Sequence, residues 1–419
     1  MAIFVNNKGK QTLKHLHMKN LKLGVVAVAM SLCSMALGQE KVTITVKQPE
    51  HGLVTITPTI PSNREIAKGT ELTVTVRAID RGWSFDSGYY RPGGRGVYME
   101  SMTSEFKVTA NTDLEIGGSM IETSRLEGYS VIQDVVYAKP GAKALKYDVF
   151  IPDGAKDLPC IVIIHGGGWT SNVEDIMRGE ARELIKGGKY VVCSIDYRWV
   201  GTLDGDGTPN RMNDLINDCY GAILHIQENA AEYGIDPTRI AVTGDSAGGH
   251  LSAAVANMVE NVGKKGFGVR EGVYEFLPSY LPKGVSVRKA RKNLLAIKAA
   301  APSYGLFEKG PISDFVKDMT PEEANAVCPL YIIPDASVRA IPQYLTLGTK
   351  DNLIKKDDVE RYAEALRSAG QKVELQMVEG ASHAFFDWKP DSRTKATFEK
   401  YGVPYCADMV RFFDEVFYK

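Results

Sequence analysis

The sequence feature that most restricts the fold is Ser246, which stands between Gly244 and Gly248 at the end of a short apolar run. Residues 239–242 of that run are typical of a buried strand, and the apolar residues after the serine recur at helical spacing. A tight turn between a strand and a helix leaves no room for side chains beside it, which favours glycine there. The pattern predicts a strand, a sharp turn and a helix, with the Ser246 hydroxyl presented on the turn.

Apolar runs alternate with helical patterns over residues 126–419. The runs are almost continuously apolar, as parallel strands buried on both faces require, and they occupy residues 161–164, 190–195, 240–242, 294–300 and 344–347. Apolar residues between the runs recur at helical spacing, for example within residues 212–226. Strands that alternate with helices through short loops predict an α/β fold with a doubly wound, mostly parallel sheet.

A different pattern covers residues 40–122. Apolar and polar residues alternate there with period two, as in Val42, Ile44 and Val46, and turn residues separate the runs. This alternation is typical of half-buried strands, and no helical pattern interrupts it. We predict a small all-β module, which resembles the β-repeat modules attached to many secreted bacterial proteins. Glycan or the cell surface is a possible partner of this module.

Residues 1–38 carry the pattern of a cleaved secretory signal peptide, preceded by an upstream extension over residues 1–17. Lys19 and Lys22 come before an apolar run over residues 23–37, and Ala36 and Gly38 supply the small residues of a cleavage site. The run is shorter than the roughly 20 apolar residues of a membrane span. We therefore expect a secreted or periplasmic protein, with an uncleaved anchor as the alternative.

The composition is ordinary for a soluble globular protein, with 44% hydrophobic and 24% charged residues. The formal net charge is −1, so no overall field would recruit nucleic acid, which we exclude as a partner. The five cysteines after the signal region cannot all pair. Cys160, Cys193 and Cys219 stand at apolar positions, where we expect buried free thiols, with one bridge as the alternative.

Three glycines follow the predicted strand 161–164, in the stretch His165-Gly166-Gly167-Gly168-Trp169. Glycines at a strand end let the backbone approach a ligand closely. We assign the N–H groups of Gly167, Gly168 and Ala247 to an oxyanion hole, and we expect His165 to fix the loop by hydrogen bonding. A phosphate-binding loop is the alternative, but the stretch lacks the spacing of the standard phosphate motifs.

A base and an orienting carboxylate complete the predicted site. His383 lies in a polar loop after the predicted strand 373–378, and Asp351 follows the predicted strand 344–347. Because the carboxyl ends of parallel strands meet at one edge of a sheet, both side chains should approach Ser246. The sequence therefore predicts a Ser246, His383 and Asp351 triad, in which His383 takes the serine proton and Asp351 orients the imidazole.

These motifs together resemble the α/β-hydrolase superfamily over residues 126–419. The resemblance rests on His-Gly-Gly-Gly-Trp, Gly-Asp-Ser-Ala-Gly-Gly, Gly-Thr-Lys-Asp and Ser-His-Ala-Phe, in that order along the chain. Within the superfamily, they are most similar to the hormone-sensitive-lipase-like esterases and the secreted bacterial acetylxylan or feruloyl esterases. The resemblance implies the same triad and oxyanion hole, and we expect neither a metal nor an organic cofactor.

Residues 261–293 form a longer insertion than the simplest members of this superfamily carry. The insertion is rich in lysine and arginine, including Arg288 and Lys289, and it holds aromatic residues such as Phe276 and Tyr280. One interpretation is a solvated loop. The other is a cap over Ser246 whose aromatic rings contact a sugar or aryl group, and whose basic charge favours glycans that bear uronic acids.

The predicted function is a secreted serine carboxylesterase. By resemblance and secretion, we expect the substrate to be a small acyl ester or an acylated polysaccharide, with acetyl or feruloyl groups of plant polysaccharide as the first choice. One alternative is a peptidase or arylamidase with the same triad. The other is a glycan-binding protein whose hydrolase domain is vestigial.

Overall fold

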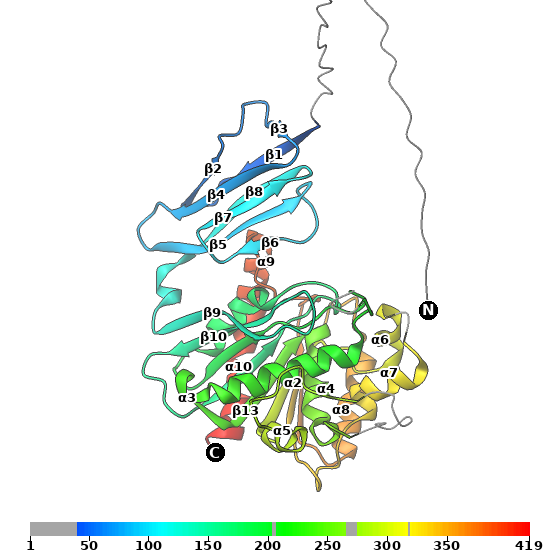
Figure 1. The fold of residues 1–419 in the computed structure, drawn as a ribbon. Helices are drawn as coiled ribbons and strands as arrows, with labels where there is room; N and C mark the ends of the chain where they lie inside the picture. The colour runs from blue at the N-terminus through cyan, green and yellow to red at the C-terminus, as the bar shows by residue number, and fades with distance from the viewer. Residues whose placement is uncertain (1–39, 203–206, 265–274, 317–318) are drawn as a thin grey trace, which may run out of the picture. The chain divides into compact units, whose positions relative to one another are not determined.

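The computed structural model describes residues 40–202, 207–264, 275–316 and 319–419 (Figure 1). The predicted signal peptide, residues 1–38, and residues 265–274 of the insertion lie outside the described residues. Residues 41–419 form one compact unit. Among the helices described, none combines the length and the apolar composition that crossing a membrane requires.

The first eight strands build two small sheets, whose strand orders are β3-β1-β8-β5-β6 and β2-β4-β7. All strand pairs in them are antiparallel except β1 with β8. Leu72, Val74 and Val76 of β4 are fully buried in the core of these sheets, so the predicted alternation reflects one buried face. The strands are β1 (Lys41–Lys47), β2 (Gly52–Thr57), β3 (Glu65–Ala67), β4 (Thr70–Ala78), β5 (Trp83–Pro92), β6 (Met99–Ser101), β7 (Glu105–Ala110) and β8 (Leu114–Glu122). This confirms an all-β region before the α/β fold.

The remaining strands form one eight-stranded sheet of order β16-β15-β14-β13-β11-β12-β10-β9. Strand β10 runs antiparallel to both of its neighbours, β9 and β12, and the six strands from β12 to β16 in this order run parallel to one another. The strands are β9 (Tyr129–Ala138), β10 (Leu145–Pro152), β11 (Leu158–Ile164), β12 (Val191–Ile195), β13 (Ile235–Asp245), β14 (Ile297–Ser303), β15 (Gln343–Gly348) and β16 (Val373–Val378). The predicted fold class is therefore confirmed.

Helices cover both faces of this sheet, as the doubly wound pattern predicts. Helices α2 and α4 pack together on one face, and α10 lies on the other (Figure 1). Helix α1 packs on α10. Every residue of α4 is buried, so this helix lies at the centre of the fold. The helices are α1 (Arg178–Leu184), α2 (Met212–Glu228), α3 (Ala230–Tyr233), α4 (Ala247–Asn257), α5 (Val287–Leu294), α6 (Lys309–Phe315), α7 (Pro321–Val327), α8 (Lys356–Ser368), α9 (Ser392–Thr397) and α10 (Val403–Phe417).

One predicted strand begins later in the structure than in the sequence pattern. The apolar run 294–300 was expected to be extended throughout, but Leu294 is the last residue of α5 and β14 begins at Ile297. Leu294 is apolar because α5 buries it, together with Ala290, against the rest of the fold. The buried end of a helix and a buried strand follow each other closely here, so in the sequence they look like one continuous apolar run.

The five cysteines of the described residues are buried and unpaired, as the sequence predicts for the first three. Cys160 and Cys193 lie on the neighbouring strands β11 and β12, and their sulfur atoms are 3.8 Å apart. That distance exceeds the sulfur–sulfur bond length of about 2.05 Å, so the two thiols are in contact without a bond.

Candidate active site

Four parallel strands carry the loops of the site to one edge of the sheet. Ile164 at the end of β11 is aligned with Gly244 of β13, and Ser303 of β14 is aligned with Asp245. In β15, Gly348 is aligned with Val378 at the end of β16. The loops that follow these strands hold the glycines, Ser246, Asp351 and His383, so the strand register brings segments far apart in the sequence together.

The turn at Ser246 has a strained backbone and no space for larger neighbours. Ser246 has φ 53° and ψ −114°, a region that non-glycine residues rarely adopt. A Cβ atom on Gly248 would lie 1.9 Å from the carbonyl oxygen of Ile164, and one on Gly244 would lie 2.4 Å from it. The glycines are therefore required by the close approach of β11, whereas the sequence pattern predicted them from the tightness of the turn alone.

The side chains of Ser246, His383 and Asp351 form a continuous hydrogen-bonded chain. The Nε2 atom of His383 is 2.9 Å from Oγ of Ser246, and Nδ1 of His383 is 2.8 Å from Oδ2 of Asp351. The Asp351 side chain is fully buried, whereas 17% of the His383 side chain is exposed. The structure thus brings together all three residues that the sequence predicted, with the order of contacts that a serine, base and carboxylate require.

The carboxylate of Asp351 is held in its ionised form by hydrogen bonds. Burial alone would raise its pKa, but the hydrogen bonds from His383 and from the backbone N–H of Ile354 and Leu353 outweigh burial. The pKa of Asp351 therefore lies below its ordinary value. The two backbone N–H groups donate to Oδ1 at 2.8 and 2.9 Å, which leaves Oδ2 for the imidazole of His383. An ionised acceptor fixes a proton on Nδ1, so Nε2 faces the serine as the basic atom.

The predicted oxyanion loop has the backbone conformation that its glycines suggest. Gly167 has φ 113° and Gly168 has φ 60°, both in the region that favours glycine. A Cβ atom on Gly167 would also lie 2.4 Å from the carbonyl oxygen of Ser171. Ala247 is the first residue of α4, so its N–H is among the helix donors without an intrahelical acceptor. The structure places these three residues at the same edge of the sheet as Ser246.

Two further residues support the site, and no sequence motif marked them as functional. Asp245 accepts a hydrogen bond from the N–H of Gly166 at 2.7 Å, which joins the oxyanion loop to the serine turn. Burial and the nearby charge of Asp387 raise the pKa of Asp245 to about 7. Tyr304 accepts a hydrogen bond from the N–H of Phe386 at 3.3 Å, and its ring meets the His383 ring edge-on at 5.0 Å.

Two other histidines near the motifs act as fixed hydrogen-bonding groups. His165 is fully buried, with Nδ1 at 2.7 Å from the carbonyl oxygen of Gly166 and its ring stacked on Tyr197, so it fixes the loop as predicted. Burial lowers the pKa of His250 to about 4, so that ring is neutral. It accepts a hydrogen bond from Nε1 of Trp169 at 3.2 Å and donates to the carbonyl oxygen of Val327 at 2.9 Å.

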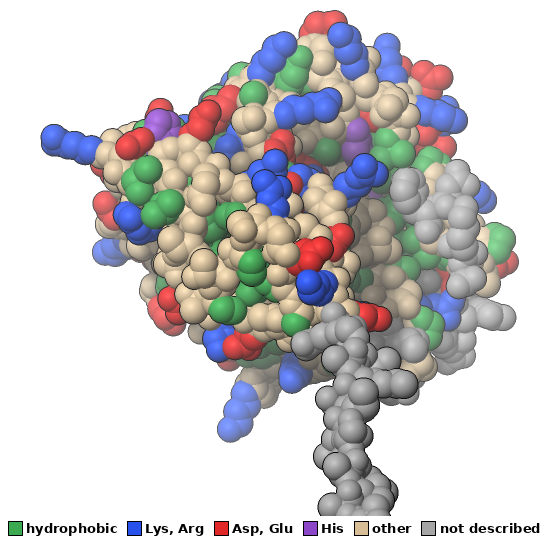
Figure 2. Space-filling model, turned by 90° about the horizontal axis from the view of Figure 1, so that it is seen from above, with side chains coloured by type: hydrophobic (Ala, Val, Ile, Leu, Met, Phe, Trp, Pro, Cys, Tyr) green, Lys and Arg blue, Asp and Glu red, His purple; other side chains and the backbone are tan. Residues whose placement is uncertain are grey.

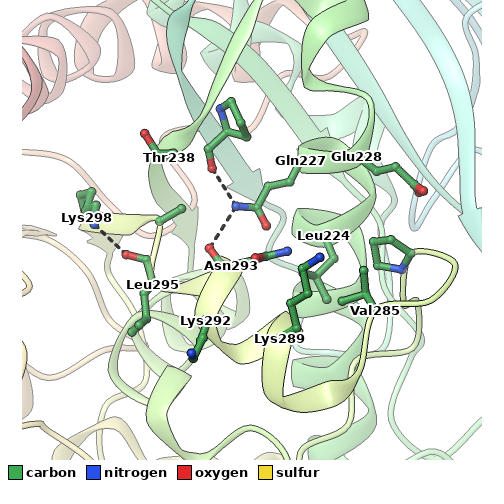
Figure 3. Close-up of a pocket in the computed structure, with 13 residues that line it drawn as sticks. Leu224, Gln227, Glu228, Thr238, Val285, Lys289, Lys292, Asn293, Leu295 and Lys298 are labelled. Atoms are coloured by element: carbon green, nitrogen blue, oxygen red, sulfur yellow. Dashed lines mark hydrogen bonds between the residues drawn. The ribbon is translucent and has the colours of Figure 1, made fainter.

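The described part of the insertion does not cover the serine, so the interpretation as a cap is wrong for those residues. Helix α5 leads into the beginning of β14, and Ser246 follows the end of the parallel strand β13. Lys289 and Lys292 of α5 instead line a pocket of about 480 Å³ with Thr238 and Lys298, which lie near the beginnings of β13 and β14 (Figure 3). A connection from the end of α4 to the beginning of β14 starts and finishes at the opposite edge of the sheet.

Phe276 and Tyr280, in the described part of the insertion, also have other roles than those predicted. Phe276 is fully buried, and it packs in the large hydrophobic core. The Tyr280 hydroxyl donates to the carboxylate of Glu228 at the end of α2. Neither ring is placed to contact a substrate at Ser246. Residues 265–274 of the insertion lie outside the described residues.

A strained serine turn after β13, the fifth strand of this sheet along the chain, with a histidine and an aspartate from later strand ends, defines the class of α/β hydrolases. In agreement, the family model described as the alpha/beta hydrolase fold matches residues 161–387, which is more than half of the chain. The chain therefore belongs to that family.

Two of the curated relatives are esterases of one bacterial species. The chain is 29% identical over 265 residues to Carboxylesterase NlhH of Mycobacterium tuberculosis, a match that covers 61% of this chain and 76% of that protein. It is 27% identical over 248 residues to Carboxylic ester hydrolase LipN of the same species, covering 56% of this chain and 59% of that protein.

Solved structures with the same fold include two esterases. Esterase 2 of Thermogutta terrifontis matches with a TM-score of 0.50 and 24% identity, covering 70% of this chain and 94% of that chain. The esterase of Pyrobaculum calidifontis matches with a TM-score of 0.50 and 19% identity, covering 70% of this chain and 88% of that chain. At these identities the likeness concerns the fold.

Proposed function

We propose that this protein is a serine carboxylesterase that uses Ser246, His383 and Asp351 as its catalytic residues. The observation that carries the proposal is the distance of 2.9 Å between Nε2 of His383 and Oγ of Ser246, with Asp351 on the other ring nitrogen. The names of the relatives NlhH and LipN support a carboxylic ester as the substrate class.

In the proposed mechanism, His383 takes the proton of Ser246 while the serine oxygen attacks the ester carbonyl. The carbonyl oxygen becomes negatively charged, and the N–H groups of Gly167, Gly168 and Ala247 stabilise it. The tetrahedral intermediate then releases the alcohol, which receives its proton from His383. Water, activated by His383, finally attacks the acyl-enzyme and frees both the acid and Ser246.

The arrangement of donors and acceptors suits this sequence of steps. Asp351 is buried and ionised, so it stabilises the imidazolium that forms each time His383 holds the serine proton. Asp245 ties Gly166 to the serine turn, which keeps the oxyanion donors at a fixed distance from Ser246 before substrate arrives. Donors fixed in advance need no reorganisation when charge develops.

A second proposal concerns the substrate and the compartment. We propose acetyl or feruloyl esters of plant polysaccharide as substrates and a secreted or periplasmic location, because of the motifs and the signal-like pattern of residues 1–38. Positive and negative side chains are interspersed over the described part of the face in Figure 2, which is compatible with a neutral polysaccharide. Contact of strands β1–β8 with glycan stays a prediction.

The test compares wild type with Ser246→Ala on p-nitrophenyl acetate, p-nitroacetanilide and native xylan. We expect rapid hydrolysis of the ester, little turnover of the anilide, and release of acetate or ferulate from xylan. Ser246→Ala should lose at least about 10³-fold in kcat, whereas Ser337→Ala, at an exposed position, should match wild type. Full activity of Ser246→Ala would refute the triad, and faster anilide hydrolysis would indicate a peptidase or arylamidase.

A further inference from the structure

Asp86 of strand β5 is a buried carboxylate surrounded by donors from the α/β-hydrolase region. Its side chain is fully buried and belongs to the β1–β8 module. Apart from Ser119 on β8, its partners come from α1, α9 and the segment after His383. They are Arg178 Nε and Nη2, both at 3.2 Å, Arg182 Nη1 at 2.7 Å, Trp388 Nε1 at 2.9 Å, Ser119 Oγ at 3.1 Å and Lys395 Nζ at 3.6 Å.

The charges around Asp86 require it to be ionised. Burial would raise the pKa of Asp86, but the positive charges of Arg178 and Arg182 outweigh burial and hold the pKa well below its ordinary value. Glu100 of β6 adds a second carboxylate, 2.6 Å from Nη2 of Arg178. Because Arg178 is itself buried, loss of Asp86 would leave it with Glu100 as its remaining carboxylate, and the ion pair of Arg182 with Asp86 would be lost.

One connection runs from Asp86 to the catalytic histidine. Trp388 is five residues after His383, and its indole N–H donates to Asp86 at 2.9 Å. The backbone N–H of Trp388 also donates to the carbonyl oxygen of Ile176 at 3.3 Å. Between them, Phe386 donates its backbone N–H to Tyr304 at 3.3 Å. The short segment after His383 is therefore fixed at its far end by the carboxylate of Asp86.

A second connection runs from Asp86 to the oxyanion loop. Helix α1 begins at Arg178, shortly after the loop that contains Gly167 and Gly168. Gly179 of α1 lies directly against Trp388, because a Cβ atom on Gly179 would be 2.9 Å from Cβ of Trp388. The helix that follows the oxyanion loop and the segment that follows His383 thus meet at one carboxylate of the β1–β8 module.

We propose that Asp86 is a positioning residue for the active site, and that the β1–β8 module is thereby a working part of the hydrolase. Asp86 touches no reacting atom, but it fixes Trp388 and α1, which set the places of His383 and the oxyanion donors. The inference rests on the proposed function, since it assigns a role in the reaction of Ser246. It gives the module a function that does not depend on binding glycan.

The decisive variant is Trp388→Phe, which keeps an aromatic ring but removes the N–H that donates to Asp86. The ion pairs of Asp86 with Arg178 and Arg182 remain, so we expect the variant to fold. For p-nitrophenyl acetate, kcat should fall about ten-fold while KM stays within about two-fold, because the substrate's own contacts are unchanged. The rate constant for phosphonylation of Ser246 by a fluorophosphonate, per titrated site, should fall by a similar factor.

Trp83→Phe is the matched control, because Trp83 lies on the same strand as Asp86 but stacks on His51 of the module. We expect this control to keep the kcat of wild type. If Trp388→Phe lowers only the melting temperature, and kcat per titrated site equals that of wild type, then the contact is merely structural and the inference is wrong.

Asp86→Asn tests the carboxylate itself. We expect a loss of kcat larger than that of Trp388→Phe, and the double variant should lose no more than about two-fold beyond Asp86→Asn, because both act on the same contact. Independent, multiplied losses would contradict the inference. Where Asp86→Asn does not fold, Trp388→Phe decides alone. Full turnover by Ser246→Ala would refute the proposed function, whereas loss in Ser246→Ala with an unchanged Trp388→Phe would refute only the positioning role.

Discussion

Two aspartates close to the serine turn show how surroundings decide what a residue does. Asp351 accepts hydrogen bonds from His383 and two backbone N–H groups, and its pKa is lowered. Asp245 is buried near Asp387, and its pKa is raised to about 7. Asp351 is thus suited to stabilise an imidazolium, whereas Asp245 is suited to hold the backbone N–H of Gly166. The same residue type therefore stabilises a charge at position 351 and holds a backbone loop at position 245.

The first prediction concerns Asp351→Asn. The amide keeps the size of the carboxylate but can donate to Nδ1 of His383, which favours the tautomer with its proton on Nε2. That tautomer cannot accept the proton of Ser246, so kcat for an acyl ester should fall about 10³- to 10⁴-fold at neutral pH. Stopped assays with titrated enzyme measure the change. Asp357→Asn, at an exposed position in the first turn of α8, is the control. A loss below ten-fold would contradict the role of Asp351.

The second prediction uses Asp148, a buried residue whose pKa is raised to about 7 by burial and by the charge of Asp175. A carboxyl with a raised pKa in the folded state stabilises the fold less as pH rises, because unfolding allows it to ionise. The cost therefore develops between about pH 4, the ordinary value, and about pH 7. Asp148→Asn removes this loss of stability, because the amide does not ionise, and it keeps an acceptor for the N–H of Asp134.

Urea unfolding at pH 4.5 and pH 8 checks this prediction. The variant should gain free energy of unfolding relative to wild type on going to pH 8, by at most about 4 kcal/mol. Asp134→Asn, whose side chain is exposed, serves as the control and should show a smaller change. An equal difference between variant and wild type at both pH values would show that Asp148 is ionised throughout.

At the residue scale, the sequence allowed us to predict the residues that lie in known catalytic motifs. It did not allow us to predict the residues that only hold those motifs in place. The meeting of Ser246, His383 and Asp351 could be predicted because each follows a predicted strand within a recognisable motif. Tyr304 also follows a strand, but a tyrosine at a strand end is equally common in a core. Asp86 had no local signal at all, since its partner Trp388 lies 302 positions away in the sequence.

At the scale of elements, the serine turn and α4 are a single packed unit with β11. The carbonyl oxygen of Ile164 lies where a side chain on Gly248 would begin, and all of α4 is buried. The beginning of α4 is therefore held at a fixed position relative to the end of β11, and this fixes the position of the Ser246 hydroxyl. Backbone atoms rather than side chains form this contact, so the surroundings cannot yield by changing a rotamer.

The third prediction follows from that contact. Gly248→Ala would place a Cβ atom 1.9 Å from the carbonyl oxygen of Ile164, so either β11 or the serine turn must move. We expect loss of soluble protein or, in folded material, loss of sites titratable with a fluorophosphonate. Gly310→Ala in α6 is the control, because a Cβ atom there meets nothing within 4 Å, and it should equal wild type or unfold at a higher temperature. A Gly248→Ala enzyme with the melting temperature of wild type and all of its sites titrated by the fluorophosphonate would show that the turn tolerates a side chain at this position, and would contradict the prediction.

Sequence patterns gave most elements their type, because a strand buried on both faces and an amphipathic helix have distinct periods. They did less well where one element ends and another begins. Residues 294–300 joined the last turn of α5 to β14, since both are buried. The position of the insertion was also missed, because composition suggested a contact with substrate. The insertion connects the end of α4 with the beginning of β14. This connection alone already favoured a position of the insertion at the sheet edge opposite Ser246.

At the scale of the whole chain, two predictions from the sequence concern the same compartment. A signal peptide over residues 1–38 would expose the mature protein to oxidising conditions, where thiols tend to pair. All five cysteines of the described residues are nevertheless free and buried, and even the sulfur atoms of Cys160 and Cys193 are only in contact. Burial raises the pKa of Cys219 and Cys406 well above the ordinary value, which keeps the reactive thiolate form rare.

The fourth prediction is therefore a count of thiols in protein collected from the secreted or periplasmic fraction. Native protein should react negligibly with Ellman's reagent, because the reagent needs an accessible thiolate. After denaturation without reductant, five thiols per chain should react, since the chain has 6 cysteines and Cys33 would leave with the predicted signal peptide. Six would show that the leader is retained, and three would show that one bridge has formed. The intact mass of the protein reports independently whether residues 1–38 have been cleaved. The thiol count and the mass together therefore distinguish an uncleaved anchor from a wrong prediction of the number of free thiols.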